Sequence, residues 1–304
     1  MAVIRTEDLG KTYKGGTVAL RGLNLEVQAG EVFGFLGPNG AGKSTTIQLL
    51  LNFIRPGTGA AFLFDRPVSC TEARQGLGYL PESVDLPGYY SGRGLLEFHG
   101  GLLGLAAEDV SRQAMERLER VGLAEAAERK ISEYSQGMLQ RLGLGQALLN
   151  DPELLILDEP TSNLDPVARR DFRDIVLDLK AGGTTVFICS HILSEVESVC
   201  DRVAILQQGE LKRAGTLEEL SAESAGFVVR ARELPGGAME ALAAAGARLT
   251  VEGEASTISC PDRRVLEEVE EVLQRFGVEA DQVETRSQSL EEIFFGAIEG
   301  QENE

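Results

Sequence analysis

The 304-residue chain is predicted to be an α/β protein with a parallel core sheet and a second, smaller α+β domain. Three short segments carry the first part of this prediction. Residues 32–36, 154–158 and 184–190 are almost continuously apolar, which is typical of parallel strands covered on both faces. Helical patterns over 44–53 and 166–180 separate these segments. The resulting alternation of strand and helix favours a mostly parallel sheet.

The remaining elements of the first domain follow from local patterns. Alternating residues over 19–37 predict strands of an antiparallel β subdomain that lead into the first buried strand. From about 88 to 150 the strand patterns give way to apolar residues at helical spacing, which predicts an inserted helical subdomain. A hairpin is expected at 202–215. We therefore expect the first domain to span residues 1–220.

A second domain is expected over residues 221–304, where acidic residues predominate and lysine is absent. The predicted order is strand, helix, hairpin, helix, strand and helix, at 227–232, 237–246, 247–260, 262–276, 278–286 and 289–298. An apolar stripe at helical spacing supports the fourth element and is formed by Val265, Val269, Val272 and Phe276. This β-α-β-β-α-β order predicts a small ferredoxin-like fold rather than a solvated acidic tail.

Composition excludes several classes of protein. The formal net charge of −19 argues against a nucleic-acid-binding protein, because phosphate backbones require a basic surface. The four cysteines are widely spaced, which predicts reduced thiols and a cytoplasmic setting. The N-terminal residues lack the apolar core of a signal peptide, and no window approaches 18 continuous apolar residues. We therefore expect contact with a membrane only through a partner protein.

The segment GPNGAGKST connects the strand at 32–36 to the helix at 44–53 and predicts a phosphate-binding loop. Its glycines allow the backbone to wrap closely around phosphate oxygens, and the helix start adds partial positive charge. Lys43 is expected to neutralise the β- and γ-phosphates, and the Ser44 hydroxyl to bind Mg²⁺. The predicted nucleotide-binding residues of the loop are Gly37, Pro38, Asn39, Gly40, Ala41, Gly42, Lys43, Ser44 and Thr45.

Two carboxylates end the strand at 154–158. Acidic side chains at the end of a buried strand are tolerated where they serve a charged ligand. Asp158 is expected to join the magnesium shell, and Glu159 to reach a water molecule in line with the γ-phosphate. The alternative is a pair of acids that cap the next helix. Beside a phosphate-binding loop, the catalytic interpretation is the stronger one.

His191 directly follows the strand at 184–190. Because that strand is expected to run parallel to 154–158, His191 should lie at the same sheet edge as Glu159, where it would sense the γ-phosphate. The alternative is a solvent-facing histidine at a helix start. The other histidine, His99, lies in the helical segment and is expected to be a surface residue.

With these motifs in place, residues 1 to about 220 resemble the nucleotide-binding subunit of an ABC transporter. The resemblance implies that Tyr13 stacks on adenine, although a core tyrosine on an edge strand is the alternative. It implies that Ser162, Asn163, Leu164 and Asp165 line a dimer interface, with Asp165 near nucleotide. His191 matches the switch histidine of the family. The implied cofactors are ATP and Mg²⁺.

The segment Tyr134-Ser135-Gln136-Gly137-Met138 matches the family's signature sequence, Leu-Ser-Gly-Gly-Gln. In that family the signature precedes a helix whose N-terminus binds the γ-phosphate of ATP held by the opposite subunit. Ser135 and Gly137 are retained, whereas Gln136 replaces a glycine. The resemblance therefore implies that Ser135 and Gly137 contact nucleotide in a second subunit.

Three further features resemble the export branch of the family. Glu82 stands where a glutamine is usual, and the resemblance implies that it contacts magnesium and acts as a lever toward the membrane subunit. Tyr134 and Met138, and the C-terminal segment SLEEIFFGAIEG, also resemble members of that branch.

The family therefore implies an ATPase that dimerises, with itself or a related subunit, around two ATP–Mg²⁺ and drives a separately encoded permease at the inner face of the cell membrane. In-line attack by water would use Glu159, His191 and Lys43. Two alternatives remain: a permease-free ABC ATPase acting on nucleic acid or ribosomes, and a catalytically weak regulatory module. The single ATPase unit and the acidic composition argue against the first, and the complete motif set argues against the second.

Overall fold

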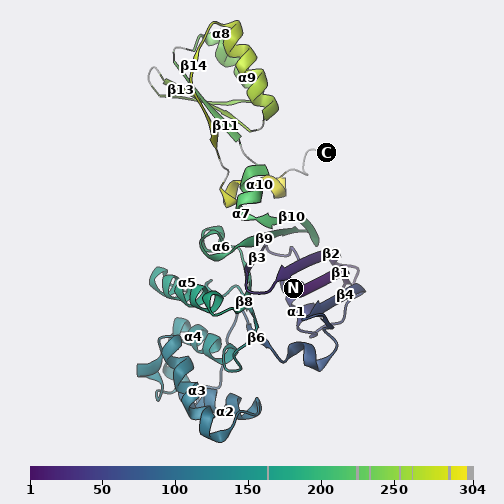
Figure 1. The fold of residues 1–304 in the computed structure, drawn as a ribbon, viewed down its shortest axis with the longest axis vertical. Helices are drawn as coiled ribbons and strands as arrows, with labels where there is room; N and C mark the ends of the chain where they lie inside the picture. The colour runs from purple at the N-terminus through teal and green to yellow at the C-terminus, as the bar shows by residue number, and fades with distance from the viewer. Residues whose placement is uncertain are drawn as a thin grey trace. The chain divides into compact units, whose positions relative to one another are not determined.

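The computed structural model describes residues 1–162, 164–223, 226–232, 234–252, 255–261, 263–286 and 289–299. The chain forms two compact units, Met1–Gly215 and Thr216–Glu304 (Figure 1). The boundary that we expected after residue 220 falls within a short helix, α7 (Leu217–Glu223).

A six-stranded sheet forms the centre of the first unit, and its strands lie in the order β10-β9-β3-β8-β7-β6. From β9 to β6 neighbouring strands pair in parallel. The strands are β3 (Val32–Leu36), β6 (Leu77–Leu80), β7 (Leu154–Asp158), β8 (Thr185–Ser190), β9 (Arg202–Gln207) and β10 (Glu210–Thr216). Every residue of β3, β7 and β8 is buried, which explains their continuous apolar sequences.

A second sheet has the order β2-β1-β4-β5 and pairs its strands antiparallel. It contains β1 (Ala2–Thr12), β2 (Val18–Gln28), β4 (Thr58–Leu63) and β5 (Arg66–Pro67). One hydrophobic core joins both sheets to helix α1 (Lys43–Leu50). In that core the ring of Phe187 stacks on Phe33 with centroids 5.9 Å apart. The two sheets therefore hold the start of α1 in a fixed position.

Helices occupy residues 88–150, as predicted, and no strand is present there. They are α2 (Gly92–Leu102), α3 (Ala107–Arg120) and α4 (Gln136–Ala147) (Figure 1). Two more helices follow β7 and β8, namely α5 (Pro166–Ala181) and α6 (Leu193–Val199). Short 3₁₀ helices lie at Thr71–Arg74, Ala124–Ala126 and Ile131–Glu133. Within the described ranges, no helix is long and apolar enough to cross a membrane.

The second unit has the predicted ferredoxin-like connectivity, with an antiparallel sheet in the order β12-β13-β11-β14. After α7 its elements are β11 (Gly226–Arg232), α8 (Gly236–Ala244), β12 (Arg248–Glu252), β13 (Ala255–Cys260), α9 (Arg263–Arg275), β14 (Ala280–Arg286) and α10 (Leu290–Glu299). The predicted stripe on α9 was partly wrong. Phe276 lies beyond the helix and is 39% exposed, whereas Leu266 and Leu273 join Val269 in the core.

Candidate active site

The phosphate-binding loop connects β3 to α1. At two of its glycines, nearby backbone atoms leave no space for a side chain. A Cβ atom at Gly37 would lie 2.4 Å from the Leu206 carbonyl oxygen, and one at Gly42 would lie 2.5 Å from that of Ala19. Gly42 also has φ of 112°, which favours glycine. Any side chain at these two positions would push the loop away from the sheet.

The start of α1 presents its backbone amides without a side-chain cap. Within the described chain, the N–H groups of Lys43, Ser44 and Thr45 donate to no protein acceptor. Pro38, Asn39, Gly40 and Ser44 are exposed, while Ala41 is buried and donates its N–H to the Pro38 carbonyl at 3.1 Å. Free amides at a helix start bind anions, so this geometry suits a phosphate group.

Lys43 lies in the first turn of α1 and is 7% exposed. Its Nζ donates to the Gly37 carbonyl at 2.6 Å and lies 3.7 Å from Glu159 Oε1. A buried ammonium needs such partners to offset its desolvation. Phosphate oxygens bound by the loop would compete for the same protons, which makes Lys43 a suitable phosphate ligand.

Asp158 ends β7 and is 7% exposed. Burial, followed by the charges of Glu82 and Glu159, raises its pKa to about 6, and Lys43 opposes this shift. Its Oδ1 is buried without a hydrogen-bond partner, which leaves an acceptor suited to a hard cation. The described residues contain no cluster of three or more candidate metal ligands. Mg²⁺ would therefore need oxygen atoms from Ser44 and from phosphates in addition to Asp158.

Glu159 and His191 meet at the ends of the adjacent strands β7 and β8, as expected for parallel strands that end at the same sheet edge. The His191 Nδ1 atom lies 2.7 Å from Glu159 Oε2, and the His191 backbone N–H donates to the same oxygen at 3.3 Å. Glu159 is 8% exposed and has a left-handed φ of 46°. Its backbone N–H donates to the Cys189 carbonyl at 2.9 Å. A strained backbone at a buried carboxylate is common at active sites.

Glu82 and Tyr13 lie at the margins of this cluster. Glu82 is exposed, yet its charge contributes to the raised pKa of Asp158. Tyr13 is 38% exposed, so it is not a core residue, and its hydroxyl lies 3.3 Å from Thr45 Oγ1. Its ring therefore remains accessible beside the first turn of α1.

Ser135 caps helix α4, and its Oγ accepts the Met138 N–H at 3.3 Å. Ser135 and Gln136 are exposed, whereas the Tyr134 ring is buried and its hydroxyl donates to the Ala126 carbonyl at 2.7 Å. Among the described residues, no hydrogen bond or ion pair joins Ser135 or Gly137 to the phosphate-binding loop. The structure therefore does not bring these two predicted site residues into the Lys43–Glu159–His191 cluster.

Residues 162–165, the predicted dimer-interface segment, include described residues that form contacts within the chain. Ser162 Oγ donates to the Glu159 carbonyl at 3.1 Å, and Leu164 is buried near Gly137. Asp165 caps α5 by accepting the Ala168 N–H at 2.8 Å. Asn163 lies outside the described residues.

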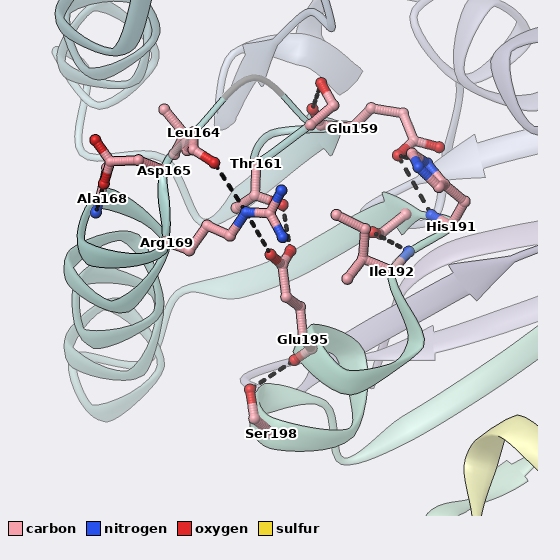
Figure 2. A network of polar contacts seen from close by, with 12 residues as sticks. Glu159, Thr161, Leu164, Asp165, Ala168, Arg169, His191, Ile192, Glu195 and Ser198 are labelled. Carbon is pink, nitrogen blue, oxygen red and sulfur yellow. Dashed lines mark hydrogen bonds and ion pairs between the residues drawn. The ribbon is translucent and has the colours of Figure 1, made fainter.

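Sequence reasoning missed three polar residues beside Glu159 and His191, namely Thr161, Arg169 and Glu195 (Figure 2). Glu195 lies on α6, which begins two residues after His191, so an acidic residue in the first turn after the histidine was the available signal. The expectation for His99 was wrong. His99 is partly buried, its Nδ1 is enclosed, and burial lowers its pKa.

Comparisons with known proteins agree with this geometry. The model of the ABC transporter family matches residues 20–162. An uncharacterized ABC transporter ATP-binding protein of Nostoc sp. is 48% identical over 72% of this chain and 68% of its own. A daunorubicin resistance ATP-binding protein of Streptomyces coeruleorubidus is 37% identical over 95% of this chain and 94% of its own. A fluoroquinolones export ATP-binding protein of Mycobacterium tuberculosis is 41% identical over 72% of each chain.

Solved structures show the same cassette fold. A component of an ABC transporter complex from Clostridium perfringens has a TM-score of 0.67 and 27% identity, covering 73% of this chain and 91% of its own. The chain is thus similar in sequence to ABC transporter proteins. It also has the phosphate-binding loop and the acidic residues Asp158 and Glu159 at the end of β7. The chain therefore belongs to the ABC transporter family, as one of its ATP-binding, ATP-hydrolysing subunits.

Proposed function

We propose that this chain drives an exporter by dimerising around two ATP–Mg²⁺ and closing on a separately encoded membrane permease. The observation that carries the catalytic part is the Lys43–Glu159–His191 cluster at the phosphate-binding loop. Relatives whose names include daunorubicin resistance and fluoroquinolone export support transport out of the cell. The protein would then act at the inner face of the cell membrane, held there by its permease.

In the proposed reaction, the loop amides and Lys43 hold the β- and γ-phosphates. Glu159 orients a water molecule in line with the γ-phosphate or accepts its proton, and His191 fixes the Glu159 carboxylate through the 2.7 Å contact. Mg²⁺, held by Ser44 and Asp158 with Glu82 nearby, supplies positive charge to the phosphates when bound. Tyr13 would contact adenine, and Ser135 and Gly137 would contact ATP of the opposite subunit.

Two substitutions test this assignment. Lys43→Ala should lose ATP affinity because phosphate contacts are removed. Glu159→Gln should bind ATP normally and hydrolyse it at least about a hundredfold more slowly, the scale of a lost general base. ATP binding by equilibrium titration and phosphate release in a single turnover measure the two effects separately. A Glu159→Gln protein with near-normal turnover would remove Glu159 from this role.

A group of exposed apolar side chains in the segment that follows Glu82 supports a protein partner. We call it the aromatic patch, and it contains the exposed side chains Tyr89, Phe98, Leu102 and Leu103, with the half-buried Tyr90 ring in contact with both Tyr89 and Phe98. Tyr89 is 76% exposed and Leu102 is 71% exposed, although both are large apolar side chains. Contiguous apolar surface of this kind marks interaction sites. It follows Glu82 closely in the chain, where the permease is expected to couple.

The partner can be tested by co-purification of a polytopic membrane protein with the native chain. Phe98→Asp should reduce recovery of that partner, whereas Phe53→Asp, at an exposed phenylalanine outside the aromatic patch, should not. Glu82→Gln should keep ATPase activity within several-fold, and Glu82→Ala should impair coupling more than ATP binding. Complete loss of ATP binding in both Glu82 variants would make Glu82 a structural carboxylate.

A further inference from the structure

A second polar cluster joins the segment after β7 to the segment after β8. The Thr161 hydroxyl donates a hydrogen bond to Glu195 Oε2. The Arg169 Nε atom donates to the Leu164 carbonyl at 3.0 Å and lies 3.4 Å from Glu195 Oε1. We call Thr161, Arg169 and Glu195 the α6 contact cluster (Figure 2). Glu195 Oε2 thus accepts a hydrogen bond from the loop, while Oε1 is a buried atom that pairs with the charge of Arg169 without a hydrogen bond.

The α6 contact cluster is partly buried. Thr161 is 5% exposed, whereas the side chains of Glu195 and Arg169 are 24% and 37% exposed. All three residues also line a cavity of about 310 Å³ between α5 and α6. The cavity leaves open space beside the cluster, so the polar contacts add to the apolar packing of α6, which the buried Val196 supplies.

Two residues of the α6 contact cluster lie close in sequence to Glu159 and His191, which contact each other. Thr161 follows Glu159 by two residues, and Glu195 follows His191 by four. The same two segments are therefore joined twice, first by Glu159 with His191 and again by Thr161 with Glu195. His191 itself is 54% exposed at its side chain, so packing alone holds its ring weakly.

We propose that Glu195 is a positioning residue for ATP hydrolysis, holding α6 so that His191 stays in contact with Glu159. The inference rests on the proposed role of Glu159 and His191. Through the Thr161 and Arg169 contacts, Glu195 also fixes the loop that carries Leu164 toward α4. A small displacement of a reacting group lowers turnover much more than it lowers binding, because the chemical step requires close alignment.

Single-turnover ATP hydrolysis by the full-length protein tests the proposal. Glu195→Ala should lower the rate of the chemical step by about ten- to a hundredfold, with ATP affinity changed by less than about threefold. Thr161→Val is a nearly isosteric second variant and should lower the rate less. Glu195→Gln retains an acceptor for the Thr161 hydroxyl and should recover part of the loss. Glu197→Gln is the matched control, because Glu197 is exposed on the same helix, and its rate should be unchanged.

A double-mutant cycle separates positioning from general destabilisation. If Glu195 acts through His191, adding Glu195→Ala to His191→Ala should cause no further loss of rate. Full additivity of the two losses would overturn the proposal. A drop in melting temperature with an unchanged rate per folded molecule would also overturn it, because Glu195 would then only stabilise the fold.

Glu159→Gln serves as the reference in the same assay. A slow Glu159→Gln protein together with a normal Glu195→Ala protein would overturn only the positioning role of Glu195. Normal turnover in Glu159→Gln would instead overturn the proposed function of Glu159, whatever the Glu195 variants show.

Discussion

Helices α1 and α4 both begin at glycine-containing motifs, with Gly42 just before α1 and Gly137 in the first turn of α4, yet their starts are built differently. α1 begins after Gly42 and has no side-chain cap, whereas α4 begins after Ser135, whose hydroxyl caps the helix. Neither helix has an acidic residue in its first turn, so the positive end of each helix dipole is available to an anion.

The surroundings of the two helix starts differ more than the starts themselves. At α1 the buried Lys43 and the nearby Glu159 complete a site within one chain. At α4 the residues Ser135 and Gln136 are exposed. Of these two helix starts, only the start of α1 has charged side chains beside it that complete a phosphate site. Any anion bound at α4 would therefore have to bring its other ligands with it, as ATP held by a second subunit would.

Matched glycine substitutions should show the largest difference between the two starts. Gly42→Ala places a Cβ atom 2.5 Å from the Ala19 carbonyl oxygen at a φ of 112°, and ATP affinity should fall by about a hundredfold or more. Gly137→Ala meets nothing closer than Leu164 Cδ2 at 3.5 Å, so ATP affinity of the monomer should change by less than about twofold. Equilibrium titration with nucleotide measures both. Equal losses in the two variants would contradict the comparison.

The acids beside α1 should make the stability of the first unit depend on pH. The folded pKa of Asp158 is raised from 3.8 to about 6, so the folded protein holds this proton more tightly than the unfolded chain. Stability should therefore fall as the pH rises from about 4 to about 6, and remain lower above that range. Asp158→Asn removes this loss, so its stability relative to the native protein should rise by about 2–3 kcal/mol between pH 4 and pH 8.

Urea denaturation without nucleotide or metal ions measures this difference. An Asp158→Asn protein whose relative stability is the same at both pH values would show that burial of the Asp158 charge costs little.

A smaller effect on stability is expected at the contact of Gly92 with Tyr134, the residue that precedes the Ser135 cap of α4. A Cβ atom at Gly92 would lie 2.4 Å from the Tyr134 hydroxyl oxygen, so Gly92→Ala should displace the buried Tyr134 and destabilise the protein by about 1–3 kcal/mol. Gly101→Ala, on the same helix with no atom within 4 Å of its Cβ, should instead stabilise by up to about 1 kcal/mol. Thermal unfolding distinguishes the two. Equal effects would mean that Tyr134 does not hold this segment.

The sequence predicted those features that are encoded within one segment. The buried strands β3, β7 and β8 were visible as apolar runs, and the expected parallel direction of β7 and β8 predicted that Glu159 and His191 share one sheet edge. Lys43 was identified from the phosphate-binding motif at residues 37–45, which lies within one continuous segment. The ferredoxin-like order of the second unit followed from the same alternation of patterns.

Features that depend on contacts between distant segments were not predictable. Gly92 and Tyr134 are 42 positions apart, and only their packing shows why the first must lack a side chain. Helix α6 has seven residues, and the sequence indicated only a candidate helix start at His191, so the contact of Glu195 with Thr161 was missed. Phe276 was assigned to the α9 stripe because helical periodicity does not show where a helix ends.

In the proposed function, the start of α4 acts on ATP held by a second copy or a related subunit. In a Glu159→Gln background, ATP should produce a dimer that size-exclusion chromatography resolves. Adding Ser135→Arg should abolish this dimer, because a bulky side chain blocks the helix start, while each monomer still binds ATP through residues 37–45. An ATP-dependent dimer that persists in the double variant, or loss of ATP binding by its monomer, would contradict the account.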